Sequence, residues 1–136
     1  MAALTGPRNT PAALGDVRAF PLPAGGKVFQ GAIVALTAAG FATGATATAA
    51  NVTVGRADET VDNGEGANGD AKVKVRRGVF RFANSGGADA IALTEVGKPC
   101  FVVDDQTVAK TDNAGARPEA GKVFDVDAQG VWVEFL

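Results

Sequence analysis

The segment AKVKVRRGVFRFA, residues 71–83, decides the fold class, because it has the most regular alternation of polar and apolar side chains in the chain. Its first half alternates cations with valines, which gives an extended strand one charged face and one apolar face. Strict alternation past Gly78 would place Phe80 and Phe82 on the charged face. We therefore predict a one-residue β-bulge at Arg77-Gly78, which returns both phenylalanines to the valine face.

Further strand-like runs lie on both sides of this segment, separated by Gly, Pro, Asn and Asp. They occupy residues 17–20, 27–36, 51–57, 100–103, 107–110, 122–127 and 131–136. The last two predict a terminal hairpin, and residues 91–96 predict a single helical turn closed by Gly97. This spacing predicts an all-β fold, a compact β-sandwich or β-barrel of about eight or nine short strands.

The composition agrees with a β fold. The chain has 27 Ala, 18 Gly and 17 Val but only six Leu among its 136 residues, which is unlike a helical bundle. Abundant Val and Thr favour strands, and Gly and Pro favour turns. We expect the eight Phe and the single Trp to supply most of the large core side chains.

The first sixteen residues, MAALTGPRNTPAALGD, have no regular period. Pro7 and Pro11 exclude a regular helix or a central strand there. We therefore predict an extended N-terminal arm over residues 1–16, which is mobile unless a neighbour holds it. Residues 17–136 are predicted to form a single β domain.

The sequence offers little for catalysis. It has no His and one Cys, so a Ser-His-Asp triad and an intramolecular disulfide are both excluded. Cys100 lies in an apolar strand and is expected to be buried. The acidic segment 58–70 lacks the ligand spacing of a calcium loop, and Asp104 and Asp105 are typical turn residues. We expect no enzymatic activity, no cofactor and no metal site.

Charge and hydropathy limit the partners. The formal net charge is −2 and the pI is about 5.0, so we expect no nucleic-acid partner. The only basic cluster is predicted to be a solvated strand face or a contact for a charged protein. It consists of Lys72, Lys74, Arg76, Arg77 and Arg81. Residues 28–55 carry no charge, but few of them are large and apolar and many are Ala, Thr and Gly, so we expect no membrane span; the N-terminus has no basic run followed by an apolar stretch, so we expect no signal peptide.

Several segments, taken in order, resemble a family of small tailed-phage capsid decoration (cement) proteins. The resemblance covers residues 26–136 and is carried by NVTVGRA at 51–57, DNGEGANGD at 62–70, VKVRRGVFR at 73–81, NSG at 84–86, VGKPCFVVDDQTVA at 96–109 and GVWV at 130–133. No single motif is diagnostic, and the order and spacing together carry the resemblance.

This resemblance implies a β-rich, non-enzymatic virion protein, made in the host cytoplasm and bound to the outer surface of the capsid. The implied partners are the major capsid protein and further copies of the chain itself, as a homotrimer. We expect residues 1–16 to become ordered on the capsid and the β body to make the self-contact. The expected capsid or subunit interface residues are Thr5, Pro7, Arg8, Pro11, Arg76 and Arg77.

Two other functions remain open from the sequence. A head-completion or tail structural protein of the same virion would be expected to have nearly the same sequence features. The number of copies per particle distinguishes such a protein from a decoration protein. A carbohydrate-binding β module displayed on the particle would present exposed aromatic rings for sugar stacking. The chain has one Trp, no Tyr and phenylalanines mostly in core-like positions, which weighs against such a module.

Overall fold

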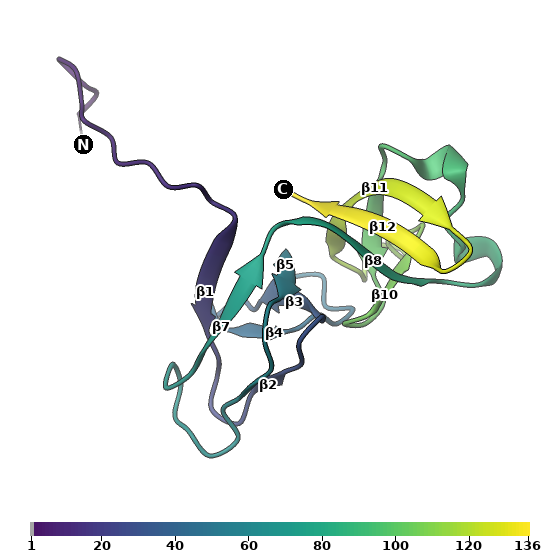
Figure 1. Cartoon of the computed structure of the whole chain (residues 1–136), viewed down its shortest axis with the longest axis horizontal. Helices are drawn as coiled ribbons and strands as arrows, with labels where there is room; N and C mark the ends of the chain where they lie inside the picture. Colours follow the sequence, from purple (N-terminus) through teal and green to yellow (C-terminus); the bar gives the residue numbers. More distant parts are fainter. Residues whose placement is uncertain (1) are drawn as a thin grey trace.

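The computed structural model describes residues 2–136, and their fold is all-β, as the sequence predicts. The strands are shorter and more numerous than expected, with twelve in the described residues. They divide into two groups that follow the chain: β1 to β7 form two sheets, and β8 to β12 form a closed barrel (Figure 1).

The first group consists of a five-stranded sheet and a separate two-stranded sheet. The strand order is β1 (Val17–Pro21), β7 (Lys72–Arg76), β5 (Val52–Ala57), β3 (Ile33–Leu36) and β4 (Ala42–Gly44), and all neighbours are antiparallel. A separate pair joins β2 (Lys27–Val28) to β6 (Val61–Asp62). Buried Val, Ala and one Leu fill the core of this half.

The second group closes on itself. Its order is β10 (Thr107–Ala109), β8 (Gly78–Asn84), β12 (Gly130–Phe135), β11 (Glu119–Asp127) and β9 (Pro99–Val102), which pairs back with β10. The terminal hairpin β11–β12 is confirmed, and its inner residues Val131, Val133 and Phe135 are buried. Two short 3₁₀ turns, η1 (Gly87–Asp89) and η2 (Leu93–Glu95), lie between β8 and β9. The second is the helical turn predicted before Gly97.

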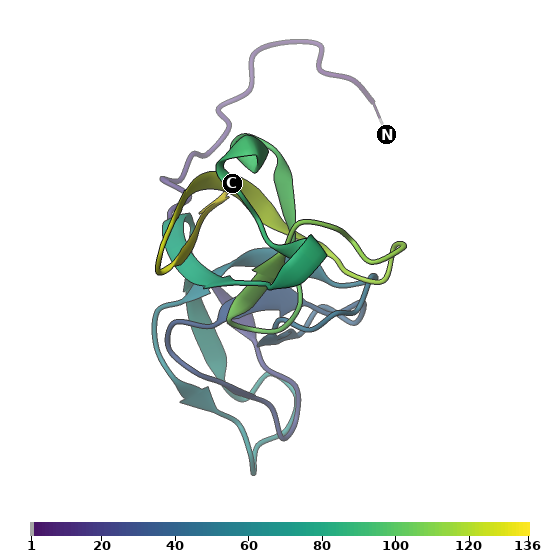
Figure 2. The same ribbon diagram turned by 90° about the vertical axis from the view of Figure 1, so that its right-hand side faces the viewer.

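Strand β3 joins the two halves, because both of its faces are buried. Ile33 and Ala35 belong to the apolar cluster of the barrel, whereas Val34 belongs to that of the five-stranded sheet. The backbone N–H of Ile33 also donates to the carbonyl of Asp105, in the turn between β9 and β10, at 2.8 Å. Figure 2 shows the barrel stacked on the sheet half in this way.

The predicted bulge at Arg77-Gly78 is wrong, although the change of face that it was meant to explain is real. Strand β7 ends at Arg76 in one sheet, and β8 begins at Gly78 in the other. Gly78 has φ of 142°, a backbone conformation that L side chains rarely adopt, and it permits this passage. The valines of β7 and Phe82 of β8 are therefore buried in two different cores.

The strand predicted over residues 27–36 is divided. Gly31 has φ of 89°, and the N–H of Ala32 donates to the carbonyl of Phe29 in a turn. As a result β2 pairs with β6, whereas β3 pairs with β4 and β5.

The expectation that phenylalanines supply most of the core is also wrong. Only Phe82 and Phe135 are buried, and Phe29 and Phe124 are 58% and 56% exposed. Valine and alanine fill both cores instead, because small β-branched and methyl side chains fit between short, closely packed strands.

Candidate contact surface at the root of the arm

Residues 2–16 form no helix or strand and lead away from the body (Figure 1). Every residue from Ala2 to Leu14 is exposed, and the one backbone hydrogen bond within this stretch joins the N–H of Thr10 to the carbonyl of Arg8. Leu4 and Leu14 are 72% and 95% exposed, although burial of a leucine side chain is favourable in free energy. The arm therefore has surface available for a partner outside its own body.

The base of the arm is held by Arg77. Its backbone N–H donates to the carbonyl of Asp16 at 2.9 Å, and its guanidinium Nε donates to the carbonyl of Gly15 at 3.0 Å. Strand β1 then pairs with β7 along its full length, from Val17 opposite Arg76. Arg77 thus fixes the point at which the arm leaves the sheet.

Arg76 lies beside this point in a small ionic cluster. Its NH2 group lies 3.2 Å from Asp58 Oδ2, and Arg56 NH2 lies 2.6 Å from Asp58 Oδ1. The hydrogen bond from Arg76, supported by Arg56, lowers the pKa of Asp58 below its usual value against the opposing effect of burial. Arg56 also stacks on the ring of Phe80 in β8, with its guanidinium carbon 4.2 Å from the ring centroid. The cluster therefore bridges the sheet half and the barrel.

The structure brings together only part of the predicted interface. Arg76 and Arg77 lie at the arm root, but nothing places the four arm residues against the body. These are Thr5, Pro7, Arg8 and Pro11, all exposed. Sequence reasoning missed Arg56 and Asp58. Their spacing of two along an extended segment was a usable signal, because such residues share a face of a strand.

The outer face of β1 and β7 is basic. Lys72, Lys74 and Arg76 are exposed on β7, and their neighbours on β1 are Pro21, Ala19 and Val17. The two lysines have no ion pair among residues 2–136, whereas Arg76 binds Asp58. We refer to Lys72, Lys74 and Arg76, with the small residues of β1 beside them, as the basic face.

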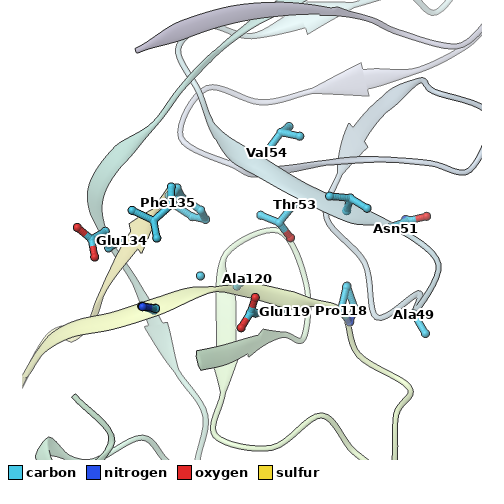
Figure 3. Close-up of a pocket in the computed structure, with 13 residues that line it drawn as sticks. Ala49, Asn51, Thr53, Val54, Pro118, Glu119, Ala120, Glu134 and Phe135 are labelled. Atoms are coloured by element: carbon cyan, nitrogen blue, oxygen red, sulfur yellow. The ribbon is translucent and has the colours of Figure 1, made fainter. Parts of the chain in front are cut away.

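A groove of about 330 Å³ lies between β5 and the neighbouring ends of β11 and β12 (Figure 3). Val52 and Leu136 line it and are 64% and 74% exposed. The hydroxyl oxygen of Thr53 is shielded from solvent and has no hydrogen-bond partner among the described residues. Glu119 and Glu134 add carboxylates to its lining.

Cys100 and three loop aspartates have hydrogen-bond partners within the fold. Cys100 is buried as expected, and burial is the main cause that raises the pKa of its thiol to about 12. In the acidic loop, Asp62 and Asp70 accept backbone N–H groups of Gly64 and Ala67. Asp104 accepts the N–H of Gln106, as expected of a turn residue.

Comparison of the chain with protein-family models, with curated proteins and with solved structures found no match. Within residues 2–136 no helix is long and apolar enough to cross a membrane. In the same residues no three His, Cys, Asp or Glu side chains are grouped in a way that could hold a metal ion.

Proposed function

We propose that this protein is a capsid decoration protein, which binds the outside of an assembled phage head and stabilises contacts between major capsid subunits. The observation that carries the proposal is an extended arm whose residues 2–14 are all exposed, attached to the β body at a root that Arg77 holds. An arm of this kind gains contacts only when a partner surface is present.

The segments that resemble decoration proteins support the proposal from another direction. Three of them coincide with strands of the body: NVTVGRA contains β5, VKVRRGVFR spans the passage from β7 to β8, and GVWV begins β12. The resemblance therefore concerns the β body, whereas the exposure of the arm is the observation that favours an external partner. The two observations are independent of each other.

The physical role follows from mass action. A ligand that binds the assembled lattice and not its separated subunits stabilises the lattice. Many copies on one shell also slow its dissociation, even when each contact is weak. In this proposal Thr5, Pro7, Arg8 and Pro11 lie on the shell, and Arg77 sets the direction in which they leave the body.

The test uses heads that lack the protein and a variant without residues 2–14, which keeps the Gly15 and Asp16 carbonyls that Arg77 binds. We expect the variant to fold with an unchanged melting temperature but to occupy heads at least about ten-fold less at equal concentration. Occupancy is measured by sedimentation of the heads followed by quantitative gel analysis. Full occupancy by the shortened protein would remove the arm from the proposal.

A point variant refines this test. Arg8→Ala removes the only Lys or Arg side chain of residues 1–16, and Lys98→Ala removes an exposed cation just before β9 as a matched control. We expect Arg8→Ala to lower occupancy and Lys98→Ala to leave it unchanged. Equal effects of the two would point to a general loss of charge.

A carbohydrate-binding module is the second candidate, and one observation favours it more than the sequence did. Phe29 and Phe124 are exposed and not in the core, so aromatic surface is available. Against it, the indole N–H of Trp132 already donates to Asp127 at 2.8 Å, and Arg81 lies over the Trp132 ring. Binding on a glycan array would favour this candidate. A copy number of a few to dozens per particle would instead favour a head-completion or tail protein.

A further inference from the structure

The groove between β5 and the ends of β11 and β12 contains a strand edge that β7 leaves unpaired. Strand β7 pairs with only the last two residues of β5, because the chain leaves that sheet at Gly78. Residues 52–54 therefore have β3 on one side and no paired strand of the described chain on the other. Arg18 donates to the carbonyl of Val54 at 3.2 Å and closes one end of this edge. The rest of the edge is available to an extended peptide.

The opposite wall is the part of β11 that extends beyond the end of β12. The pairing of β11 with β12 reaches Lys122, opposite Glu134, and within the described residues it does not include Glu119 or Ala120. Those two residues line the groove, while β11 pairs with β9 on its other side. Figure 3 shows β5, with Thr53, on one side of the groove and β11, with Glu119 and Ala120, on the other. Two strand edges therefore border the same space.

Two polar side chains of the groove lack the hydrogen bonds that buried groups usually make. Asn51 is only 9% exposed, yet its amide makes no hydrogen bond among residues 2–136. The hydroxyl oxygen of Thr53 is shielded from solvent and also has no partner there. Most buried polar groups in folded proteins are paired. An asparagine amide has a donor and an acceptor, as a peptide unit does, so the backbone of a bound peptide would satisfy it.

The lining also selects the side chains of a bound peptide. Val52 and Leu136 are 64% and 74% exposed, and an apolar side chain packed on them would remove that surface from water. Glu119 and Glu134 have no ion pair among the described residues. The lining has one cation, Lys122, which lies opposite Glu134 in the register without forming an ion pair. Two carboxylates and one amine leave the lining with a formal charge of −1.

We propose that this groove binds an extended segment of another protein, in which an apolar residue is flanked by Lys or Arg. The backbone of the segment pairs with the free edge of β5 and with the Asn51 amide. Alternate side chains of an extended segment point to opposite sides, so the apolar residue packs on Val52 and Leu136 while the cations lie toward the carboxylates at the rim. This inference goes beyond the proposed function, which rests on the arm.

The arm of a second copy does not match this occupant. Leu4 has no Lys or Arg within three residues on either side. Leu14 has none either, and it is followed by Asp16, whose carboxylate the groove would repel. A segment of a different protein is therefore the better match, and the arm serves as a competitor in the test.

Nuclear magnetic resonance of the isotope-labelled full chain tests the site with the blocked peptide acetyl-TKLKT-amide. We expect saturable chemical-shift changes centred on the backbone amides of residues 51–54 and 119–121. Acetyl-TELET-amide reverses the charge of the peptide, and acetyl-TKSKT-amide removes its apolar residue. Each of these should bind at least about ten-fold more weakly. A peptide with the sequence of residues 2–14 tests the alternative of a second copy.

Thr53→Val and Asn51→Ala test the two unpartnered groups. Thr53→Val keeps the shape of the side chain and should leave the melting temperature unchanged or higher, because the free protein loses no hydrogen bond. It should nevertheless weaken the binding of TKLKT about five-fold, and Asn51→Ala should weaken it at least as much. Thr10→Val, on the exposed arm, is the matched control and should bind as the unaltered protein does.

Charge variants separate local complementarity from an effect of net charge. Glu119→Gln with Glu134→Gln should abolish the preference for TKLKT over TELET. Glu65→Gln with Asp112→Asn changes the net charge by the same amount at exposed positions outside the groove. This control should keep the preference.

Circular dichroism establishes that each variant is folded. The inference would be overturned if TKLKT caused no shift changes in the groove, if TELET bound equally well, or if Thr53→Val and Asn51→Ala both bound normally. Tighter binding of the peptide of residues 2–14 would assign the groove to a second copy and would also overturn it. None of these results changes the arm-dependent occupancy of heads, which is measured separately. Full occupancy without the arm, with peptide binding intact, would contradict the proposed function alone.

Discussion

At the scale of single residues, Gly55 is one of the positions where the neighbouring backbone leaves no room for a side chain. It has φ of 145°, and a Cβ atom there would lie 2.5 Å from the carbonyl oxygen of Arg76. We predict that Gly55→Ala destabilises the protein by at least about 2 kcal/mol, because the substitution adds backbone strain to a clash with a rigid strand. Urea unfolding followed by circular dichroism measures this loss. Gly86→Ala is the matched control, since Gly86 has open space around it, and equal stability of the two variants would contradict the prediction.

The buried thiol of Cys100 predicts a dependence of stability on alkaline pH. Its pKa is raised from 9.0 to about 12 in the folded state, mainly by burial. Its contribution to stability is therefore fully present below pH 9, and it is lost as the pH rises toward 12, because the unfolded state releases its proton first. The chain has no Tyr, so fewer other groups titrate in this range.

The measurement compares urea unfolding of the unaltered protein and of Cys100→Ala at several pH values from 8 to about 11. We expect the stability of the unaltered protein to fall more steeply with pH than that of the variant. Removal of the sulfur changes stability at every pH, so the slope and not the absolute value is the test. Parallel slopes would show that the thiol ionises freely in the folded state.

At the scale of elements, local patterns predicted strands well and predicted their partners poorly. The alternation of residues 72–76 and 131–135 places the correct side chains in the core, because period-two burial is a local property of a strand. Gly78 also marks the place where the burial pattern changes. Sequence alone could not show that the chain changes sheets there, since a bulge and a passage between sheets both require the same glycine.

The interface was less predictable than the fold. Arg76 and Arg77 are both at the arm root, but Arg77 acts mainly through its hydrogen bonds to Gly15 and Asp16, over sixty residues away in the chain. Contacts between distant segments have no local signature. The exposure of Phe124 likewise depends on a register shift in β11, which no composition argument reveals.

The cluster around Asp58 gives a prediction for the junction between the two halves. In Asp58→Asn, the guanidinium groups of Arg56 and Arg76 lose the charge that separates them, and Arg56 is held less firmly on Phe80. We expect a loss of about 1 kcal/mol at pH 7, because the side chains are only partly exposed. The lowered pKa of Asp58 means that this contribution is present above the ordinary value of 3.8 and is lost as the pH falls below it.

Thermal unfolding at pH 7 and at about pH 2.5 tests this prediction, with Asp112→Asn as control because Asp112 is exposed and has no side-chain partner in the described residues. The unaltered protein and Asp58→Asn should differ at neutral pH and converge in acid. A difference that persists unchanged at acidic pH would assign the effect to packing and not to charge.

At the scale of the whole molecule, strand β3 contributes side chains to both cores. Ile33 is fully buried in the barrel cluster, and the next residue, Val34, is fully buried in the sheet cluster. Because adjacent residues of β3 pack in different cores, detachment of this strand would remove packing from both halves. We therefore expect the two halves to unfold in one cooperative transition. Trp132 is the only tryptophan and lies on the barrel, which makes its fluorescence a reporter of that half alone.

The decisive comparison uses Ile33→Ala and Val34→Ala. Ile33→Ala should cost about 3 kcal/mol through lost burial and the cavity that it leaves. Val34→Ala removes fewer atoms and none from the barrel cluster, yet it should still lower the midpoint reported by Trp132 fluorescence, because the barrel cannot remain folded once β3 detaches. Coincident fluorescence and circular dichroism transitions in both variants would establish this coupling. A fluorescence transition that Val34→Ala leaves in place, while the circular dichroism transition shifts, would mean that the barrel folds independently and that β3 only covers it.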